Sequence, residues 1–187
     1  MFNITPLVRN IIFVCIAVFI AQKFTSITQH LALYKINSGY FKPYQLFTYI
    51  FAHGSIGHIF FNMMTLMFLG SYLEMVCGFK RFMTYFISTG IGASLIYLLL
   101  EFVLTSSPYG VMLGASGVIY GILVAFGFLF PEKEISLMFP PISVKGKYLA
   151  IVLGVFTYLT DLSGEVAHFA HLGGGVVGFF MIKYIRF

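Results

Sequence analysis

Charged side chains are scarce in this chain of 187 residues: Asp, Glu, Lys and Arg together make up only 9% of it. A soluble domain carries about 25% charged residues, so this chain has too few of them to cover a surface that faces water. Hydrophobic residues make up 59% instead. The composition therefore excludes an ordinary soluble domain and indicates a membrane protein that crosses the bilayer several times.

Cysteine is almost absent as well, with Cys15 and Cys77 as its two occurrences. Both lie in or near apolar runs, which argues against a disulfide framework and against a cysteine-based metal site. We expect the two thiols to face lipid or to pack inside the protein. Blocks of like charge are also missing, so the net charge of +5 does not indicate a nucleic-acid partner.

Long apolar runs divide the chain into segments that can cross a bilayer, for which a helix needs about 20 residues. The predicted spans are approximately 7–24, 57–77, 82–104, 114–130, 147–161 and 166–185. We therefore predict an all-α polytopic membrane protein, in which residues 1–187 form a single bundle of six transmembrane helices. The connection 25–56 is too polar to span and too apolar to float in water, so we expect it to lie in the membrane interface.

Basic residues set the predicted orientation, because cytoplasmic loops carry an excess of Lys and Arg. With a cytoplasmic N-terminus, eight basic residues fall inside and three outside. Both chain ends are thus predicted to be cytoplasmic, and the second, fourth and sixth spans begin at the outer face. The eight inner residues are Arg9, Lys80, Arg81, Lys133, Lys145, Lys147, Lys183 and Arg186, and the three outer ones are Lys23, Lys35 and Lys42.

The spans that begin at the outer face also hold the unusual polar residues. An ionisable or strongly polar side chain within a span is costly, which makes it a functional candidate. Residues four apart share one face of a helix, and two of the three pairs have this spacing. The pairs are His58 and Asn62 in the second span, Ser116 and Tyr120 in the fourth, and His168 and His171, three apart, in the sixth.

Glycine spacing predicts how these helices meet, because small residues let helices approach closely in lipid. Two G-x-x-x-G stripes occur, and His171 shares a helix face with the second of them. If the stripes face each other, Ser116 and His171 meet near the outer ends of their helices. The stripes consist of Gly117 and Gly121 on the fourth span and Gly174 and Gly178 on the sixth.

Ser116 then has the partners that acyl transfer needs. A serine hydroxyl is a weak nucleophile without an adjacent base, and the neutral imidazole of His171 can serve as one. His58, Asn62 and the Ser116 amide are candidate donors to an oxyanion. No acid shares the helix face of His171, so we expect a Ser–His dyad with Tyr120 packing in place of a carboxylate.

Three segments resemble the rhomboid family of intramembrane serine proteases: "HGSIGHIFFN", "GASGVIYG" and "AHLGGGVVG". The resemblance implies that Ser116 is the nucleophile, that His171 is the base and that Tyr120 packs on its ring. It further implies an oxyanion hole formed by His58, Asn62 and the Ser116 amide. Such proteases cleave transmembrane segments of other proteins near their outer ends, without a metal or a cofactor.

Two features of the sequence depart from the family pattern. Many members carry Trp-Arg in the first loop, where this chain has Tyr44 and Gln45 and contains no Trp at all. His168 is a second histidine in the sixth span, and for it and for His53 we expect structural hydrogen bonds. Gly114, with Ala115, is expected to let the loop turn into the start of the fourth helix.

Alternatives to a protease remain open at this point. A catalytically silent relative that binds or escorts membrane clients would have the same fold, and a small transporter would show an internal repeat, which we do not find. A metal site is not expected, because no carboxylate or cysteine shares the histidine face. The first apolar run is interpreted as a retained span, and the absence of a targeting segment favours a bacterial inner membrane. The oligomeric state is left open.

Overall fold

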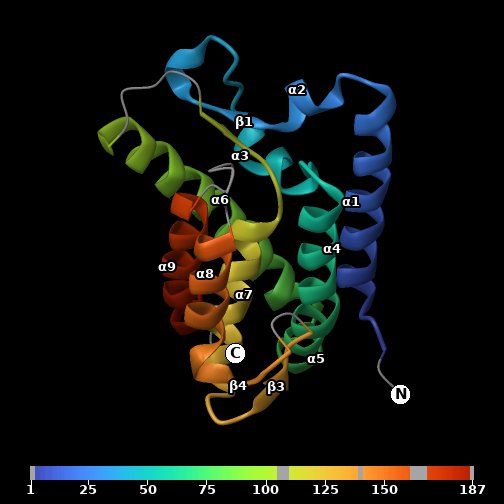
Figure 1. The fold of residues 1–187 in the computed structure, drawn as a ribbon, viewed down its shortest axis with the longest axis vertical. Helices are drawn as coiled ribbons and strands as arrows, with labels where there is room; N and C mark the ends of the chain where they lie inside the picture. Colours follow the sequence, from blue (N-terminus) through green and yellow to red (C-terminus); the bar gives the residue numbers. More distant parts are fainter. Residues whose placement is uncertain (1–2, 105–109, 139–140, 161–167, 186–187) are drawn as a thin grey trace.

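The protein is a bundle of helices packed side by side, with short strands at both ends of the bundle (Figure 1). Its computed structural model describes residues 3–104, 110–138, 141–160 and 168–185. The helices of the bundle are α1 (Pro6–Phe24), α4 (Ile56–Thr65), α5 (Ser71–Cys77), α6 (Phe79–Leu104), α7 (Ser116–Leu129), α8 (Leu149–Thr160) and α9 (His168–Ile185). A π-helical turn over Leu66–Gly70 joins α4 to α5 without a break.

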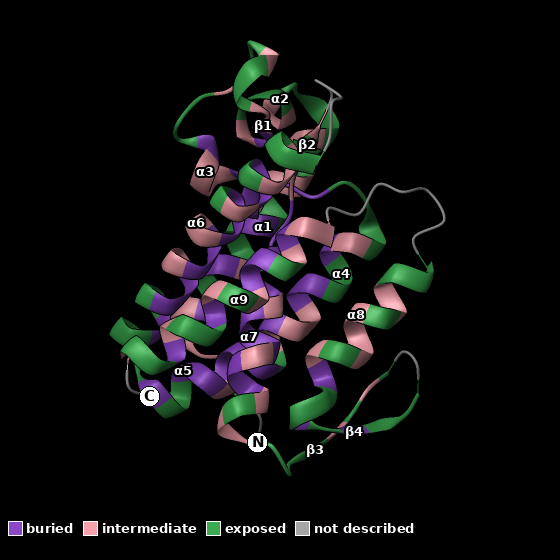
Figure 2. Cartoon of the chain, turned by 90° about the vertical axis from the view of Figure 1, so that its left-hand side faces the viewer, coloured by how far each residue is buried: buried purple, intermediate pink, exposed green. Residues whose placement is uncertain are grey.

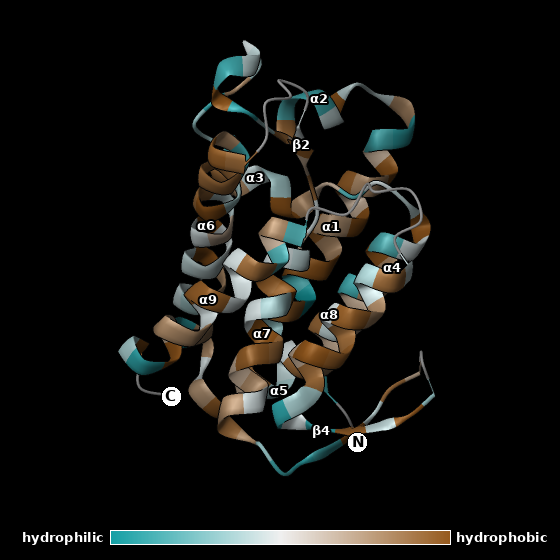
Figure 3. Ribbon diagram, turned by 60° about the vertical axis from the view of Figure 1, so that its left-hand side comes forward, coloured by the Kyte–Doolittle hydropathy of each residue, from teal (hydrophilic) through white to brown (hydrophobic). Residues whose placement is uncertain are grey.

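These helices lie over the six predicted segments and form the predicted all-α membrane bundle. Pro6–Phe24, Ile56–Cys77 and Phe79–Leu104 are each long and apolar enough to cross a membrane. Ser116–Leu129 and Gly146–Thr160 are shorter apolar helices. Hydrophobic residues predominate along the helices in Figure 3. That all six segments cross the bilayer stays a prediction.

The connection between α1 and α4 folds over one end of the bundle, which we call the outer end. It contains α2 (Ile27–Leu31), β1 (Leu33–Tyr34) and α3 (Gln45–Thr48), with 3-10 turns at Ile36–Ser38 and Tyr49–Phe51. Strand β1 pairs in antiparallel fashion with β2 (Val111–Met112), so that Leu33 lies opposite Met112. The connection is thereby fastened to the segment that leads into α7.

The opposite end of the bundle, the inner end, carries a second hairpin. Its strands are β3 (Glu134–Ser136) and β4 (Ser143–Lys145), and Glu134 pairs with Lys145. Helix α1 begins and helix α9 ends at this same end (Figure 1). This arrangement agrees with the predicted even number of crossings.

Glu74 of α5 holds the start of α1. Its buried carboxylate accepts hydrogen bonds from the first residues of that helix and from Thr5 before it. The donors are the Leu7 and Val8 amides, at 3.2 and 3.1 Å, and the Thr5 hydroxyl, at 2.5 Å. The first amides of a helix have no partner within it and attract a negative charge, so Glu74 fixes α1 to the second span.

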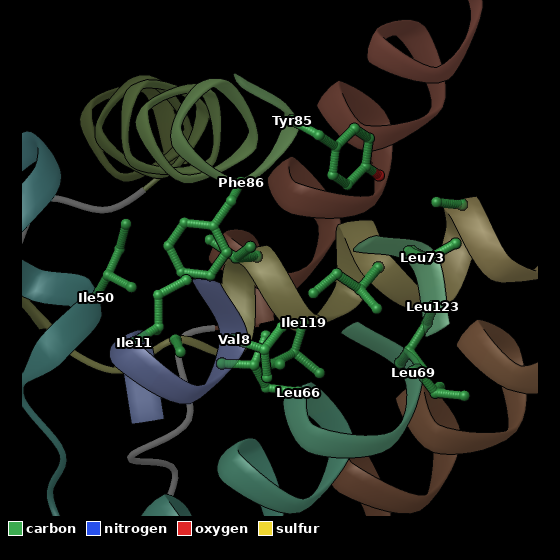
Figure 4. Packing of buried hydrophobic residues seen from close by; sticks show 14 of the residues in the cluster. Val8, Ile11, Ile50, Leu66, Leu69, Leu73, Tyr85, Phe86, Ile119 and Leu123 are labelled. Carbon is green, nitrogen blue, oxygen red and sulfur yellow. The ribbon is translucent and has the colours of Figure 1, made fainter. Parts of the chain in front are cut away.

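Helix α7 is the most enclosed helix, and α6 and α9 pack against it (Figure 2). Its buried side chains, such as Ile119 and Leu123, meet residues from α1, the π-helical turn and α6 in the core (Figure 4). Cys15 and Cys77 are both buried, which confirms that the thiols pack inside the protein. Ser116, at the start of α7, is therefore carried by a helix that is packed on several sides.

Candidate active site

Ser116 is the first residue of α7 and follows a sharply turned segment. Gly114 has a φ of 108°, a left-handed conformation that favours glycine. A Cβ there would also lie 2.5 Å from Cε1 and Nε2 of His58. The Gly114 amide donates to the Tyr49 carbonyl at 2.9 Å. The expected turn at Gly114 is confirmed, and the glycine also gives the His58 ring its place.

His53 lies under this segment and is 1% exposed. Its Nε2 accepts a hydrogen bond from the Ala115 amide at 3.4 Å, and Nδ1 lies 3.3 Å from the Phe51 carbonyl. An amide can only donate, so the proton is on Nδ1 and the ring is neutral. Burial, together with the nearby His58 ring, lowers the pKa of His53 to about 4. The structural hydrogen bonds expected of His53 are thus observed.

His58 and Asn62 are placed by the start of α4. Ser55 caps this helix, because its Oγ accepts the His58 amide at 3.1 Å. The His58 ring packs edge-on against His53, with 5.1 Å between ring centroids. Asn62 follows one turn later and is buried, and its Nδ2 has no hydrogen-bond partner among the residues that the structure describes.

The predicted glycine stripes face each other. A Cβ on Gly174 would overlap the Gly117 carbonyl, and one on Gly178 would lie 2.7 Å from Cα of Gly121. The backbones of α7 and α9 therefore touch, as small residues permit. This contact brings the outer half of α9, with His171, beside the start of α7.

His171 is stacked on Tyr120, with ring centroids 4.2 Å apart and an angle of 15° between the planes. The Tyr120 hydroxyl donates to Thr157 Oγ1 of α8 at 3.2 Å, so α8 helps to hold the tyrosine. His168 packs edge-on against His171, with ring centroids 6.0 Å apart, and lies tilted against Tyr158, at 5.4 Å. The His171 ring thus has an aromatic neighbour on its face and another at its edge.

One cavity of about 1290 Å³ joins these residues. It lies between the second span on one side and α7 and α8 on the other, and it reaches from the outer end to β3 at the inner end. The predicted nucleophile, base, oxyanion donors and packing tyrosine all line it, namely Ser116, His171, His58, Asn62 and Tyr120. Sequence reasoning therefore selected side chains that the fold brings to one space.

Some polar contacts around the site could not be predicted from the sequence. Gln22 of α1 bonds both backbone groups of His53. Lys35 forms an ion pair with Glu101 at 2.6 Å, where the side chains are only 11% and 16% exposed. The pairing of Glu101 with Lys35 ties the outer connection to α6. Both contacts join segments that are far apart in the sequence.

Gln45, which stands where many relatives carry Arg, anchors the outer connection from inside. It is buried, accepts the Lys42 amide at 3.0 Å and donates to the Tyr40 carbonyl at 3.2 Å. The neighbouring Tyr44 is half exposed. The connection therefore holds its shape through an amide side chain rather than through a Trp-Arg pair.

Metal ligands are not gathered anywhere within the described ranges: no group of three or more His, Cys, Asp or Glu side chains is suited to hold an ion. The acids nearest to His171 in the sequence, Asp161 and Glu165, lie outside the residues that the structure describes. The side chains that line the cavity include the hydroxyl, imidazole and amide groups of Tyr120, His171 and Asn62.

Comparison with known proteins gives a match to the rhomboid domain family over residues 40–186. Rhomboid protein 1, mitochondrial, of Saccharomyces cerevisiae is 30% identical over 138 residues, which is 72% of this chain and 40% of that protein. RHOMBOID-like protein 1 of Arabidopsis thaliana is 31% identical, covering 74% of this chain and 33% of the relative. Presenilin-associated rhomboid-like protein, mitochondrial, of Bos taurus is 29% identical, with 72% and 36% covered.

These relatives are considerably longer than the matched region, and the chain spans less than half of each of them. Two of them are named as mitochondrial proteins and one is a plant protein. The expected bacterial inner membrane therefore receives no support from these relatives. What the match and the helices do establish is an integral membrane protein of this architecture.

Proposed function

The chain belongs to the rhomboid family, and from that premise we propose that it is an intramembrane serine endopeptidase. Members of this family are generally proteases of this kind. The observation that carries the proposal is the shared cavity, because Ser116, His171 and three supporting side chains all line it. The proposed substrates are transmembrane segments of other membrane proteins.

The proposed reaction begins with attack of Ser116 Oγ on the carbonyl carbon of the scissile peptide bond. His171 takes the serine proton as the new C–O bond forms. The tetrahedral intermediate then collapses, the C–N bond breaks, and His171 gives its proton to the leaving amine. An acyl group remains attached to Ser116 as an ester.

Water completes the reaction. It attacks the ester carbonyl while His171 takes one of its protons, and the second tetrahedral intermediate forms. When the C–O bond to the serine breaks, His171 returns this proton to Ser116 Oγ. One peptide bond is hydrolysed, and the enzyme is restored without any metal or cofactor.

Three donors are proposed for the oxyanion: the Asn62 side chain, the His58 ring and the Ser116 amide. The unpaired Asn62 Nδ2 supports this role, because a buried donor without a partner costs about 1–3 kcal/mol. Such a cost is expected where the acceptor arrives with the substrate. The Ser116 amide belongs to the first turn of α7, whose amides have no partner within the helix.

Tyr120 supports the role of His171 as base. A ring stacked at 4.2 Å fixes the plane of the imidazole, which a carboxylate does in a Ser-His-Asp triad through a hydrogen bond. Thr157 in turn holds the Tyr120 hydroxyl. A dyad with a packed tyrosine is therefore the arrangement that we propose.

The shape of the cavity suggests how a substrate arrives. Its walls continue down the bundle between the second span, with Phe61 and Phe68, and α8, with Phe156. We propose that a substrate helix approaches through this side and unwinds near its outer end, because a helix hides its carbonyl groups from attack. The predicted orientation places Ser116 toward the outer face of the membrane.

Cleavage of a model transmembrane substrate in detergent tests the proposal. The wild type should cleave it and should react at Ser116 with a fluorophosphonate, whereas Ser116→Ala should do neither while remaining folded. Cleavage by Ser116→Ala would contradict the assignment. A wild type that neither cleaves nor reacts would favour a catalytically silent member that binds membrane clients.

A further inference from the structure

The two amides that precede the Ser116 amide are both held by one segment of the chain, residues 49–53. The Gly114 amide donates to the Tyr49 carbonyl at 2.9 Å, and the Ala115 amide donates to His53 Nε2 at 3.4 Å. Peptide units are planar, so these bonds fix two successive planes. The next plane carries the Ser116 amide, and its direction then depends only on the torsions of Ala115.

His53 is itself held on several sides. Its Nδ1–H reaches the Phe51 carbonyl at 3.3 Å, and the His58 ring packs against it at 5.1 Å. Its own backbone amide donates to Gln22 Oε1 at 3.0 Å, and its carbonyl accepts from Gln22 Nε2 at 3.2 Å. A residue held at this many points, through both its backbone and its ring, can serve as a fixed support for the segment that precedes α7.

We propose that His53 is a positioning residue, which directs the Ser116 amide toward the oxyanion through its bond to Ala115. This role rests on the proposed protease function. At 3.4 Å the bond is long, and the 2.9 Å bond of Gly114 to Tyr49 shares the task. His53 does not line the cavity with the reacting groups, so it acts through the backbone and not on the substrate.

Gln22 extends this support to α1. Its Nε2 also donates to Thr28 Oγ1 at 2.9 Å, which fixes the amide group in place. The rhomboid match begins at residue 40, so Gln22 lies in the part of the chain that precedes the match. Helix α1 therefore contributes to the placement of the nucleophile through one side chain.

Two substitutions distinguish the contact made by Nε2 of the His53 ring from the contact made by Nδ1. In His53→Gln the side-chain amide reaches about as far as Nε2 and can still accept the Ala115 amide. In His53→Asn the amide reaches only the position of Nδ1, so the Phe51 contact stays and the Ala115 contact is lost. We expect His53→Asn to lower kcat by about tenfold or more with KM within about twofold, and His53→Gln to stay within about threefold in kcat.

Hydrogen exchange of the Ala115 amide gives a second readout that does not depend on activity. Exchange should be faster in His53→Asn than in the wild type and should remain slow in His53→Gln. Ser94→Ala is the matched control, because it removes a buried hydrogen bond to the Leu46 carbonyl away from the Ser116 segment. It should lower thermal stability without a selective loss of kcat.

The outcomes are distinguishable. An equal loss of kcat in both His53 variants, with unchanged exchange at Ala115, would overturn the positioning role and leave the protease function intact. Wild-type kcat in a folded His53→Asn protein would overturn it as well. Absence of cleavage by the wild type would sink the proposed function, and the exchange of Ala115 would still decide whether His53 holds the segment.

Discussion

At the scale of single residues, Gly114 and Asn62 contribute to the site in different ways. Two features require a glycine at position 114: its left-handed φ of 108°, and the His58 ring, which occupies the space that a Cβ would need. Asn62 is different, because its Nδ2 is buried without a partner among the described residues. The first residue supports the fold of the site, whereas the second adds nothing to stability through that donor.

Asn62→Ala should therefore separate activity from stability. Loss of one oxyanion donor typically lowers kcat by about a hundredfold or more, and we expect a loss of this order. Thermal stability should be unchanged or slightly higher, because a buried donor without a partner is removed. Parallel measurements of kcat and Tm in detergent check this, and a large fall in Tm with wild-type kcat would contradict it.

Gly114→Ala should affect both quantities. The left-handed conformation costs an alanine about 1 kcal/mol or more, and its Cβ would displace the His58 ring, 2.5 Å away. We expect a lower Tm and a loss of cleavage. Gly54→Ala is a suitable comparison, because its Cβ would make an ordinary contact of 3.6 Å with Leu113; equal effects of the two substitutions would refute the role of Gly114.

His53 gives the protein a stability that depends on pH. Its pKa is about 4 in the folded protein, against a usual value of 6.5. Between these values the unfolded chain binds more protons, so stability rises with pH across this window. The stabilisation is complete above pH 6.5 and is lost as the pH falls toward 4. The difference in Tm between the wild type and His53→Gln should change with pH only within this window. A difference that is constant at every pH would exclude His53 as the cause.

At the scale of elements, the contact between α7 and α9 decides whether the proposed nucleophile, Ser116, and the proposed base, His171, meet. It could be predicted from the sequence, because the stripes repeat every four residues and this spacing keeps them on one face of each helix. Gly174 and Gly117 accordingly touch. The pairing of Lys35 with Glu101 and of β1 with β2 could not be predicted, because both depend on how loops far apart in the sequence fold over the outer end.

Gly174→Ala should separate these two helices. Its Cβ would overlap the Gly117 carbonyl, which is backbone and cannot turn aside. We expect a loss of at least about 2 kcal/mol in the free energy of unfolding and no cleavage, since His171 moves away with α9. Gly175→Ala is the matched control, because its Cβ would lie 3.6 Å from Val124. Comparable unfolding of both variants would show that the close approach is not needed.

At the scale of the whole molecule, α1 is attached at its inner end to the second span and at its outer end to the segment just before that span. Glu74 binds its first amides near the inner end, and Gln22 binds the backbone of His53 near the outer end. Buried side chains such as Val8 and Leu66 pack between these two attachments (Figure 4). The helix that precedes the matched family region is thus an integral part of the bundle.

Glu74→Gln should weaken this attachment, because an amide loses the charge that favours the start of α1. We expect a loss of about 1–3 kcal/mol in the free energy of unfolding, measured by denaturation in mixed micelles. Glu132→Gln is the control: Lys145 and Lys147 hold the pKa of Glu132 at about 2, but the carboxylate is exposed and screened by water. Equal losses in both variants would contradict the role of Glu74.

The two attachments of α1 also set an order of assembly during synthesis. Gln22 emerges from the ribosome 31 residues before His53, and Thr5 emerges 69 residues before Glu74. When α1 enters the bilayer, its partners have not yet been made, and a polar glutamine and a set of unpaired amides face lipid or the insertion machinery. Both attachments of the helix can therefore form only after residue 74 has been synthesised, and until then α1 lacks the contacts that fix its place in the bundle.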